Sequence, residues 1–158
     1  MTQSPKVCDH TSVGMMVWND GKLLLIERKK GAKGFAIPAG HVDDDSTFED
    51  AARRELGEEV GLKTIKLELL LDIRKDNPCR REGGSWHQWK IYRVDATGEL
   101  SRSLEETKQA SWFTINEIKS LSEKTEKYIR KEISEEDWEN APGLEVVMYE
   151  LFKELRII

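Results

Sequence analysis

The 158-residue sequence predicts one α+β domain spanning residues 1–158. Its length is that of a single ordinary domain with a core of its own. Short apolar runs separated by turn-forming loops predict strands through the first two thirds of the chain. Apolar stripes with helical spacing predict helices in the last third. No internal repeat or low-complexity linker divides the chain, so we expect a single folding unit.

The N-terminal quarter predicts a β-hairpin followed by a short strand. The segment "SVGMMVW" from Ser12 has the composition of a strand, and "NDG" at residues 19–21 is a tight-turn signal. The run "KLLLIERK" is then the returning strand. After a glycine-rich loop, "FAIP" predicts a further short strand ahead of the acidic segment that begins at Gly40.

Three more strands and a helical C-terminal part follow. The strands are "TIKLELLLDIR" with a mostly apolar interior, "WHQWKIYRVDA" and the short "ASWFT", with polar loops between them. From about residue 115, the segments "INEIKSL", "KTEKYIRKEI" and "GLEVVMYELFKEL" predict three amphipathic helices that pack on the domain. The last helix carries the clearest apolar stripe: Leu144, Val147, Met148, Leu151, Phe152 and Leu155.

Composition and charge restrict the class of partner and the compartment. The net charge of −5 argues against non-specific binding to nucleic acid or to an anionic membrane. No run of 18 apolar residues predicts a transmembrane helix, and "MTQSPKVCDH" has no signal-peptide core, so we expect a cytoplasmic protein. Cys8 and Cys79 are interpreted as free thiols rather than a disulfide. Together with His10, His41 and His87, they show no metal-ligand spacing, and none is assigned to a metal.

The segment "GHVDDDSTFEDAARRELGEEVGL" predicts a helix whose second half is unusual. Its start is explained by capping, with "STFE" and "TFED" as two alternative capping boxes and Gly61 as the C-terminal stop. At 100° per residue, Glu55, Glu58 and Glu59 overlap the apolar face of this helix. Carboxylates crowded on a half-buried face repel each other and lose hydration, unless a cation compensates for their charge. The three glutamates are therefore interpreted either as a binding site for a hard divalent ion or as a solvated acidic patch.

This segment resembles the Nudix box, G-x5-E-x7-R-E-U-x-E-E-x-G-U, where U is an apolar residue. Eight fixed positions match: Gly40, Arg54, Glu55, Leu56, Glu58, Glu59, Gly61 and Leu62. The flanking "KLLLIERK", "FAIPAG" and "ASWFT" are also similar to the family pattern. The resemblance implies a Nudix-type α/β/α sandwich with a mixed β-sheet. It further implies Mg²⁺ or Mn²⁺ as cofactor, held by Glu55, Glu58 and Glu59 together with Gly40.

The one departure from the box is Ser46, where the family carries a glutamate regarded as the partner of the box arginine. Serine cannot supply that charge to Arg54. Asp43, Asp44, Asp45 and Asp50 are the alternative partners, and Ser46 is then available as the helix N-cap.

The resemblance implies a metal-dependent hydrolase of the pyrophosphate bond in nucleoside diphosphate derivatives. In the loop before the closing strand, Glu106 is the candidate base and Glu105 the alternative. Arg28, Trp86 and Trp89 are candidates for substrate binding, and because the two tryptophans point to opposite faces of a strand, at most one contacts a nucleobase. Arg80 and Arg81 are expected to be surface charges.

Substrate and assembly are left open by the sequence. The segment "IPAG" is similar to ADP-ribose-cleaving members of the family, but nucleoside triphosphates and dinucleoside polyphosphates remain alternatives. A small-molecule nucleotide is the expected partner, without a nucleic acid or membrane, and a homodimer is left open. The competing function is a catalytically silent Nudix-fold module with a nucleotide-binding or regulatory role. Such a module would be expected to lose the paired glutamates, which this sequence retains.

Overall fold

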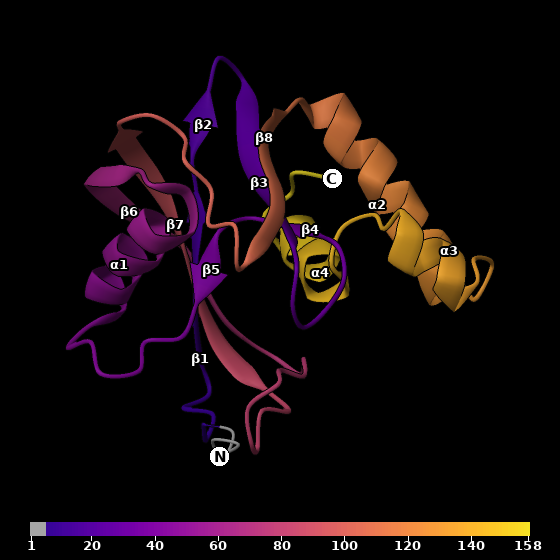
Figure 1. The fold of residues 1–158 in the computed structure, drawn as a ribbon, viewed down its shortest axis with the longest axis horizontal. Coiled ribbons are helices and arrows are strands. Elements are labelled where there is room, and N and C mark those ends of the chain that lie inside the picture. The colour runs from indigo at the N-terminus through magenta and orange to yellow at the C-terminus, as the bar shows by residue number, and fades with distance from the viewer. Residues whose placement is uncertain (1–5) are drawn as a thin grey trace.

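A computed structural model describes residues 6–158 of the chain. Its strands are β1 (Thr11–Met16), β2 (Trp18–Asn19), β3 (Lys22–Arg28), β4 (Phe35–Ala36), β5 (Ala39–Gly40), β6 (Lys63–Lys75), β7 (His87–Thr97) and β8 (Thr107–Phe113). Its helices are α1 (Phe48–Val60), α2 (Ile115–Ile129), α3 (Glu135–Asn140) and α4 (Val146–Glu154). The strands form the middle of the molecule, with α1 on one side and the other three helices on the opposite side (Figure 1). The predicted α+β class is confirmed.

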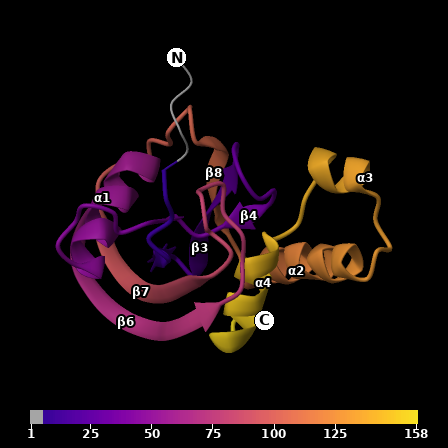
Figure 2. The ribbon, with the colours of Figure 1, turned by 90° about the horizontal axis from the view of Figure 1, so that it is seen from below.

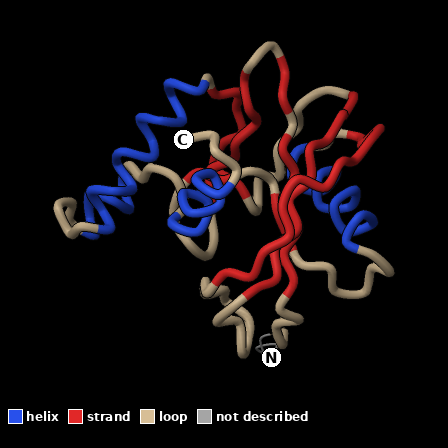
Figure 3. The backbone as a smooth tube through the Cα atoms, turned by 180° about the vertical axis from the view of Figure 1, so that it is seen from behind, coloured by secondary structure: helices blue, strands red, loops and turns tan. Residues whose placement is uncertain are grey.

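Two sheets make up the middle layer (Figure 3). The first is mixed, in the order β5-β1-β7-β6: β1 and β7 run parallel, whereas β5 and β6 join antiparallel at the two edges. In the second sheet β3 pairs antiparallel with β2, β4 and β8. The mixed sheet implied by the sequence is therefore present, and a smaller antiparallel sheet accompanies it.

The predicted hairpin forms, but the strand before it is divided. Asp20 and Gly21 have φ values of 50° and 74°, as a two-residue turn between twisted strands requires. The strand expected from Ser12 to Trp18 breaks at Val17, because β1 belongs to the first sheet and β2 to the second. The chain thus passes from one sheet to the other at this residue.

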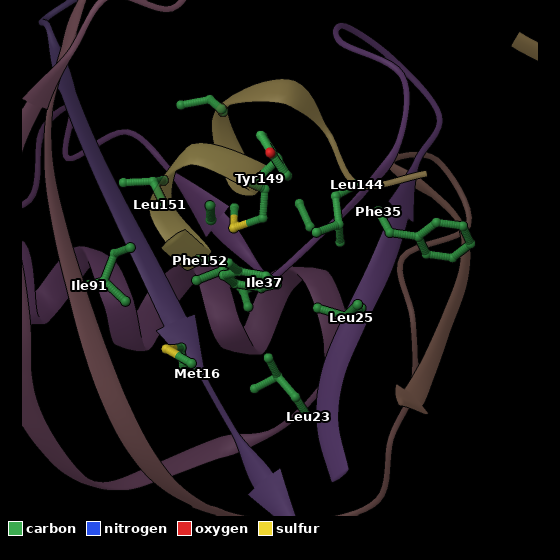
Figure 4. Close-up of a cluster of buried hydrophobic side chains, with 14 of the residues drawn as sticks. Met16, Leu23, Leu25, Phe35, Ile37, Ile91, Leu144, Tyr149, Leu151 and Phe152 are labelled. Atoms are coloured by element: carbon green, nitrogen blue, oxygen red, sulfur yellow. The ribbon is translucent and has the colours of Figure 1, made fainter. Parts of the chain in front are cut away.

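Two buried apolar clusters hold the layers together. One joins α1 to the strands and includes Val13, Met15, Leu24, Leu56 and Tyr92. The other lies on the side of α4, where side chains of β3, β4 and β7 surround the apolar stripe of that helix (Figure 4). Of the predicted stripe, Leu144, Val147, Met148, Leu151 and Phe152 are buried and Leu155 is partly buried. The stripe is thus confirmed.

Strand β6 is longer than the sequence predicted and is partly exposed. It is an edge strand that pairs only with β7, and it curves with β7 from the side of α1 towards α4 (Figure 2). Several of its apolar side chains face solvent: Ile65, Leu69 and Leu70 are 66%, 48% and 41% exposed. Apolar composition alone does not show whether the outer face of an edge strand is covered.

The C-terminal helices also differ in part from the prediction. Instead of two helices over residues 115–121 and 124–133, the chain forms one helix, α2, which no proline or glycine interrupts and which ends at Ile129. Thr114 and Glu117 form a reciprocal capping box at its start. Helix α3, capped by Ser134, was not predicted. Among the described residues, no helix is long and apolar enough to cross a membrane.

Candidate active site

The loop before α1 holds Arg54 without the glutamate that the family pattern places at residue 46. Arg54 donates from Nε to Asp45 Oδ2 at 2.8 Å, so Asp45 is the replacement partner among the four candidates. Its Nη2 also donates to the His41 backbone oxygen at 3.0 Å. The arginine therefore ties the loop after β5 to the helix. The guanidinium is shielded from water, yet its carboxylate partners, Asp45 above all, keep its pKa above the ordinary value.

The N-cap of α1 is Thr47 rather than Ser46. The Thr47 hydroxyl accepts a hydrogen bond from the Asp50 backbone N–H at 3.0 Å, in the second of the two registers that the sequence allowed. Ser46 is exposed and caps nothing in the structure, which corrects the expectation of a cap at this residue. Gly61 ends the helix with φ of 72°, as predicted.

The glutamates of α1 divide into an inward pair and an outward one. Glu59 is 3% exposed, and the side chain of Glu55 is 13% exposed. The side chain of Glu58 is 55% exposed, and its Oε2 accepts from Arg54 Nη1 at 3.1 Å. The same Arg54 nitrogen donates to Glu55 Oε1 at 2.9 Å. The structure thus brings Glu55 and Glu59 into one cavity, while Glu58 lies beside its rim.

Gly40 is next to the inward pair. A Cβ at this position would lie 2.1 Å from the Glu55 carboxyl carbon, a distance that real side chains do not reach. Only glycine lets the backbone of β5 approach this carboxylate so closely. The sequence pattern therefore has a steric reason at Gly40, whether or not its carbonyl takes part in metal binding.

Arg28 faces the inward pair from the end of β3. Its Nε donates to Glu145 Oε2 at 3.0 Å, and its Nη1 lies 4.0 Å from Glu59 Oε1. Burial opposes the positive charge, but Glu145 and Glu59 keep the pKa of Arg28 above its ordinary value. Glu145, just before α4, was missed by the sequence because it belongs to no local motif. Arg28 was expected to bind substrate, and that role stays a prediction.

The charge of the inward pair is incompletely compensated. Burial raises the pKa of Glu55 to about 7, against the opposing effect of Arg54. Burial likewise raises the pKa of Glu59 to about 8, with Arg28 opposing and Glu55 and Glu106 adding to the rise. One oxygen of Glu59, Oε2, is buried without a hydrogen-bond partner in the described chain. Two such carboxylates and an unpartnered oxygen suit a hard divalent cation.

The loop before β8 places Glu106 near this pair. Backbone bonds from Ser101 N to Val60 O and from Ser103 N to Glu59 O attach the loop to the end of α1. Lys29 N then donates to Glu106 O at 2.9 Å. Glu105 and Glu106 both line the cavity, and the charge of Glu106 helps to raise the pKa values of Glu55 and Glu59. The role of Glu106 as base, with Glu105 as the alternative, stays a prediction.

The cavity has a volume of about 330 Å³ and a mostly polar wall. Lys30, Arg80 and Arg81 bring positive charge to it; Arg80 is exposed, as expected of a surface charge, and both arginines also line the cavity. Arg81 is paired with Asp43, donating from Nη2 to Oδ2 at 2.9 Å. The cavity wall therefore contains cationic side chains as well as the carboxylates, and cations attract a negatively charged pyrophosphate.

The two tryptophans lie in different environments, although Trp86, expected on the strand, precedes β7, and only Trp89 belongs to it. Trp89 lines the cavity but is only 3% exposed, and its indole N–H donates to Asn77 Oδ1 at 3.1 Å. Trp86 lies outside the residues that line the cavity, stacked on His10 with Arg74 over its ring. Only Trp89 is therefore placed to touch a ligand in this cavity; the role of Trp86 stays a prediction.

The cysteines and histidines require a correction. Both cysteines are free thiols, as expected. However, one ligand atom from each of Cys8, His41, Cys79 and His87 lies within 4.8 Å of the others. The sequence assigned no metal to these residues because their spacing is irregular. The four come from separate segments, so only the tertiary fold brings them together.

Comparisons with known proteins agree with the family resemblance. A family model described as the NUDIX domain matches residues 9–135. The ADP-ribose pyrophosphatase of Methanocaldococcus jannaschii is 34% identical over 122 residues, covering 75% of this chain and 70% of that protein. An RNA pyrophosphohydrolase of Pseudomonas putida (strain ATCC 700007) is 39% identical over 63 residues, which cover only 40% of either chain.

A solved structure gives the same result for the fold. The MutT NUDIX hydrolase from Burkholderia pseudomallei superposes with a TM-score of 0.60 at 25% sequence identity, covering 68% of this chain and 84% of that one. The region matched by the family model contains Arg28, Gly40, Glu55, Glu59 and Glu106. It ends before Glu145.

Proposed function

Because this chain belongs to the Nudix domain family, we propose that it hydrolyses the pyrophosphate bond of a nucleoside diphosphate derivative with Mg²⁺ or Mn²⁺. The observation that carries the proposal is the inward pair, Glu55 and Glu59, facing one cavity with an unpartnered buried oxygen on Glu59. Carboxylates held in this way are destabilised unless a cation joins them. The family generally uses divalent cations, which supports this choice.

Glu55 and Glu59 would hold the cation, with Glu58 contributing from the rim and the Gly40 carbonyl from β5. When bound, such an ion neutralises the pyrophosphate and lowers the pKa of an attacking water. Arg54 orients Glu55 and Glu58 through its Nη1, so one arginine sets the direction of two carboxylates. Arg28 offsets the negative charge of both Glu59 and Glu145.

Glu106 would accept the proton of the attacking water. Its side chain is exposed, so its carboxylate can reach water, as a base must. Its backbone is fixed by hydrogen bonds at both Lys29 and Ser103. Glu106 thus lies at the cavity wall, near Glu55 and Glu59. This position suits a base that meets water better than it suits a buried metal ligand.

We propose ADP-ribose as the substrate, cleaved by water to AMP and ribose 5-phosphate. The support is the relative of that activity, which matches three quarters of this chain. Lys30, Arg80 and Arg81 provide positive charge for the phosphates, and Trp89 provides an apolar wall for the nucleoside. The relatives acting on RNA match a much shorter segment and give weaker support.

We also propose that the chain forms a homodimer and that it has no stable nucleic-acid partner. The exposed apolar side chains on the outer edge of β6, Ile65, Leu69 and Leu70, support an assembly at that edge.

A substrate panel tests the proposed activity. The full chain is incubated with Mg²⁺ or Mn²⁺ and ADP-ribose, diadenosine tetraphosphate, ATP or a 5′-triphosphorylated RNA, and the products are separated by chromatography. We expect AMP and ribose 5-phosphate from ADP-ribose at the highest kcat/KM of the panel. Binding of ADP-ribose without turnover of any compound would instead indicate the silent binding module. Faster cleavage of the RNA would overturn the proposed substrate.

A further inference from the structure

Four sulfur and nitrogen ligands meet beside the catalytic cavity. Cys8 precedes β1, His41 follows β5, Cys79 lies in the loop between β6 and β7, and His87 begins β7. One donor atom of each lies within 4.8 Å of the others. The Cys8 Sγ is 3.4 Å from His87 Nε2 and 3.6 Å from His41 Nε2. No carboxylate takes part in this cluster.

These separations match those in a tetrahedral zinc site. With Zn–S bonds of about 2.3 Å and Zn–N bonds of about 2.05 Å, a sulfur and a nitrogen at the tetrahedral angle are about 3.6 Å apart. The two sulfur–nitrogen distances of the cluster, 3.4 and 3.6 Å, are close to this value. The protein therefore positions these donors at the spacing that one shared ion requires.

The backbone holds both thiols in place. Cys8 N donates to Glu82 O at 2.8 Å, and Cys79 N donates to Gly84 O at 2.7 Å. A Cβ at Gly84 would lie 2.1 Å from Cys79 Sγ and 3.4 Å from Cys8 Cβ. Any other residue at position 84 would push the Cys79 thiol away from the cluster. Glycine at this position is thus a condition for bringing the two sulfurs together.

The donor chemistry selects the ion. Two cysteine thiolates and two imidazoles form a sulfur–nitrogen donor set that suits zinc, whereas magnesium and manganese prefer oxygen. The chain therefore offers two sites of different character, the carboxylates Glu55 and Glu59 and the sulfur–nitrogen cluster. Because four protein ligands complete a tetrahedron, the cluster leaves no open position for a reacting water.

We propose that Cys8, His41, Cys79 and His87 bind one Zn²⁺ in a closed structural site. This ion would join the N-terminal segment to the β6–β7 loop, which lies at the end of the sheet where β1 begins (Figures 1 and 3). Residues 76–86 of that loop form no helix or extended strand, so they lack a packed element to fix them.

The zinc site also reaches the catalytic cavity. His41, Cys79 and His87 line the same cavity as the inward pair of glutamates. His41 directly follows Gly40, and its carbonyl accepts a hydrogen bond from Arg54. An ion on the His41 ring would therefore fix the segment that carries Gly40 against Arg54. The zinc acts as a positioning element for the cavity wall and takes no part in the reaction.

Metal analysis of the untagged full chain tests the proposal. We expect about one zinc per chain by elemental mass spectrometry, and at least about a tenfold lower content in Cys8→Ser and Cys79→Ser. Replacing zinc by Co²⁺ in the wild-type chain should give the intense visible bands of a tetrahedral cobalt–thiolate centre. This spectrum needs no variant, so the test stands even if a cysteine variant fails to fold.

Two control variants separate this site from its surroundings and from the proposed function. His10→Gln changes a neighbouring histidine outside the cluster and should keep the zinc. Glu59→Gln should also keep it, so loss of hydrolysis and loss of zinc are distinguishable. A wild-type chain that shows no cobalt–thiolate bands after anaerobic reconstitution would overturn the proposal. A Cys8–Cys79 disulfide in anaerobically purified protein, or zinc retained by Cys8→Ser/Cys79→Ser, would overturn it as well.

Discussion

Replacing Glu59 by glutamine should stabilise the metal-free chain at neutral pH. Burial raises the pKa of Glu59 from an ordinary 4.5 to about 8, so the folded state holds a proton that the unfolded state has lost. For a raised carboxyl pKa, stability is complete below about pH 4.5 and falls as pH rises towards 8. The loss is about 1.4 kcal/mol per pH unit, or at most ~3 kcal/mol by pH 7.

Glutamine has the shape of the protonated acid and does not titrate, so it avoids this loss. In urea denaturation without Mg²⁺ or Mn²⁺, Glu59→Gln and wild type should have similar free energies of unfolding near pH 4.5. At pH 7 the variant should be more stable by up to ~3 kcal/mol. Added Mg²⁺ should then stabilise the wild type much more than the variant. A variant that is destabilised equally at both pH values, and that still gains stability from Mg²⁺, would refute the reasoning.

Three further substitutions test individual contacts. Glu106→Gln should lower kcat by about 10²-fold or more while leaving the Mg²⁺ concentration dependence unchanged, whereas a weaker Mg²⁺ dependence would make Glu106 a ligand instead. Gly40→Ala should force the Glu55 carboxylate aside and abolish turnover in a folded chain, as circular dichroism and an activity assay can show; normal turnover would contradict the close approach. Ser46→Glu should couple to Arg54 by less than about 1 kcal/mol in a double-mutant cycle, because Arg54 already has acidic partners. A larger coupling would show that the existing partners are inadequate.

Helix α1 could be predicted because its information is local. Capping residues, an apolar stripe and Gly61 specify α1 within one stretch of chain, and the same stripe turns Glu55 and Glu59 inward. The same reasoning placed Glu58 on the half-buried face, and this was wrong: its side chain is 55% exposed, because it lies at the boundary of the stripe. In the structure it pairs with Arg54 one turn earlier and stays in solvent.

The remaining features depend on tertiary contacts and carry no local signal. The passage from β1 to β2 at Val17 is set by which sheet each strand joins. Glu145 enters the site only because α4 packs beside β3 and β4. Cys8 and His87 meet because β1 and β7 run parallel in one sheet, which residue spacing does not encode.

The rate of AMP release from ADP-ribose, measured against Mg²⁺ concentration, tests the central claim most directly. The wild-type chain is compared with the double variant Glu55→Gln/Glu59→Gln. Zinc content and circular dichroism are measured first, to show that the two chains agree in both. We predict a saturable activation by Mg²⁺ in the wild type and a rate at least about 10³-fold lower in the double variant at every Mg²⁺ concentration. A double variant that reaches the wild-type rate at saturating Mg²⁺ would contradict the assignment of the cation to this carboxylate pair.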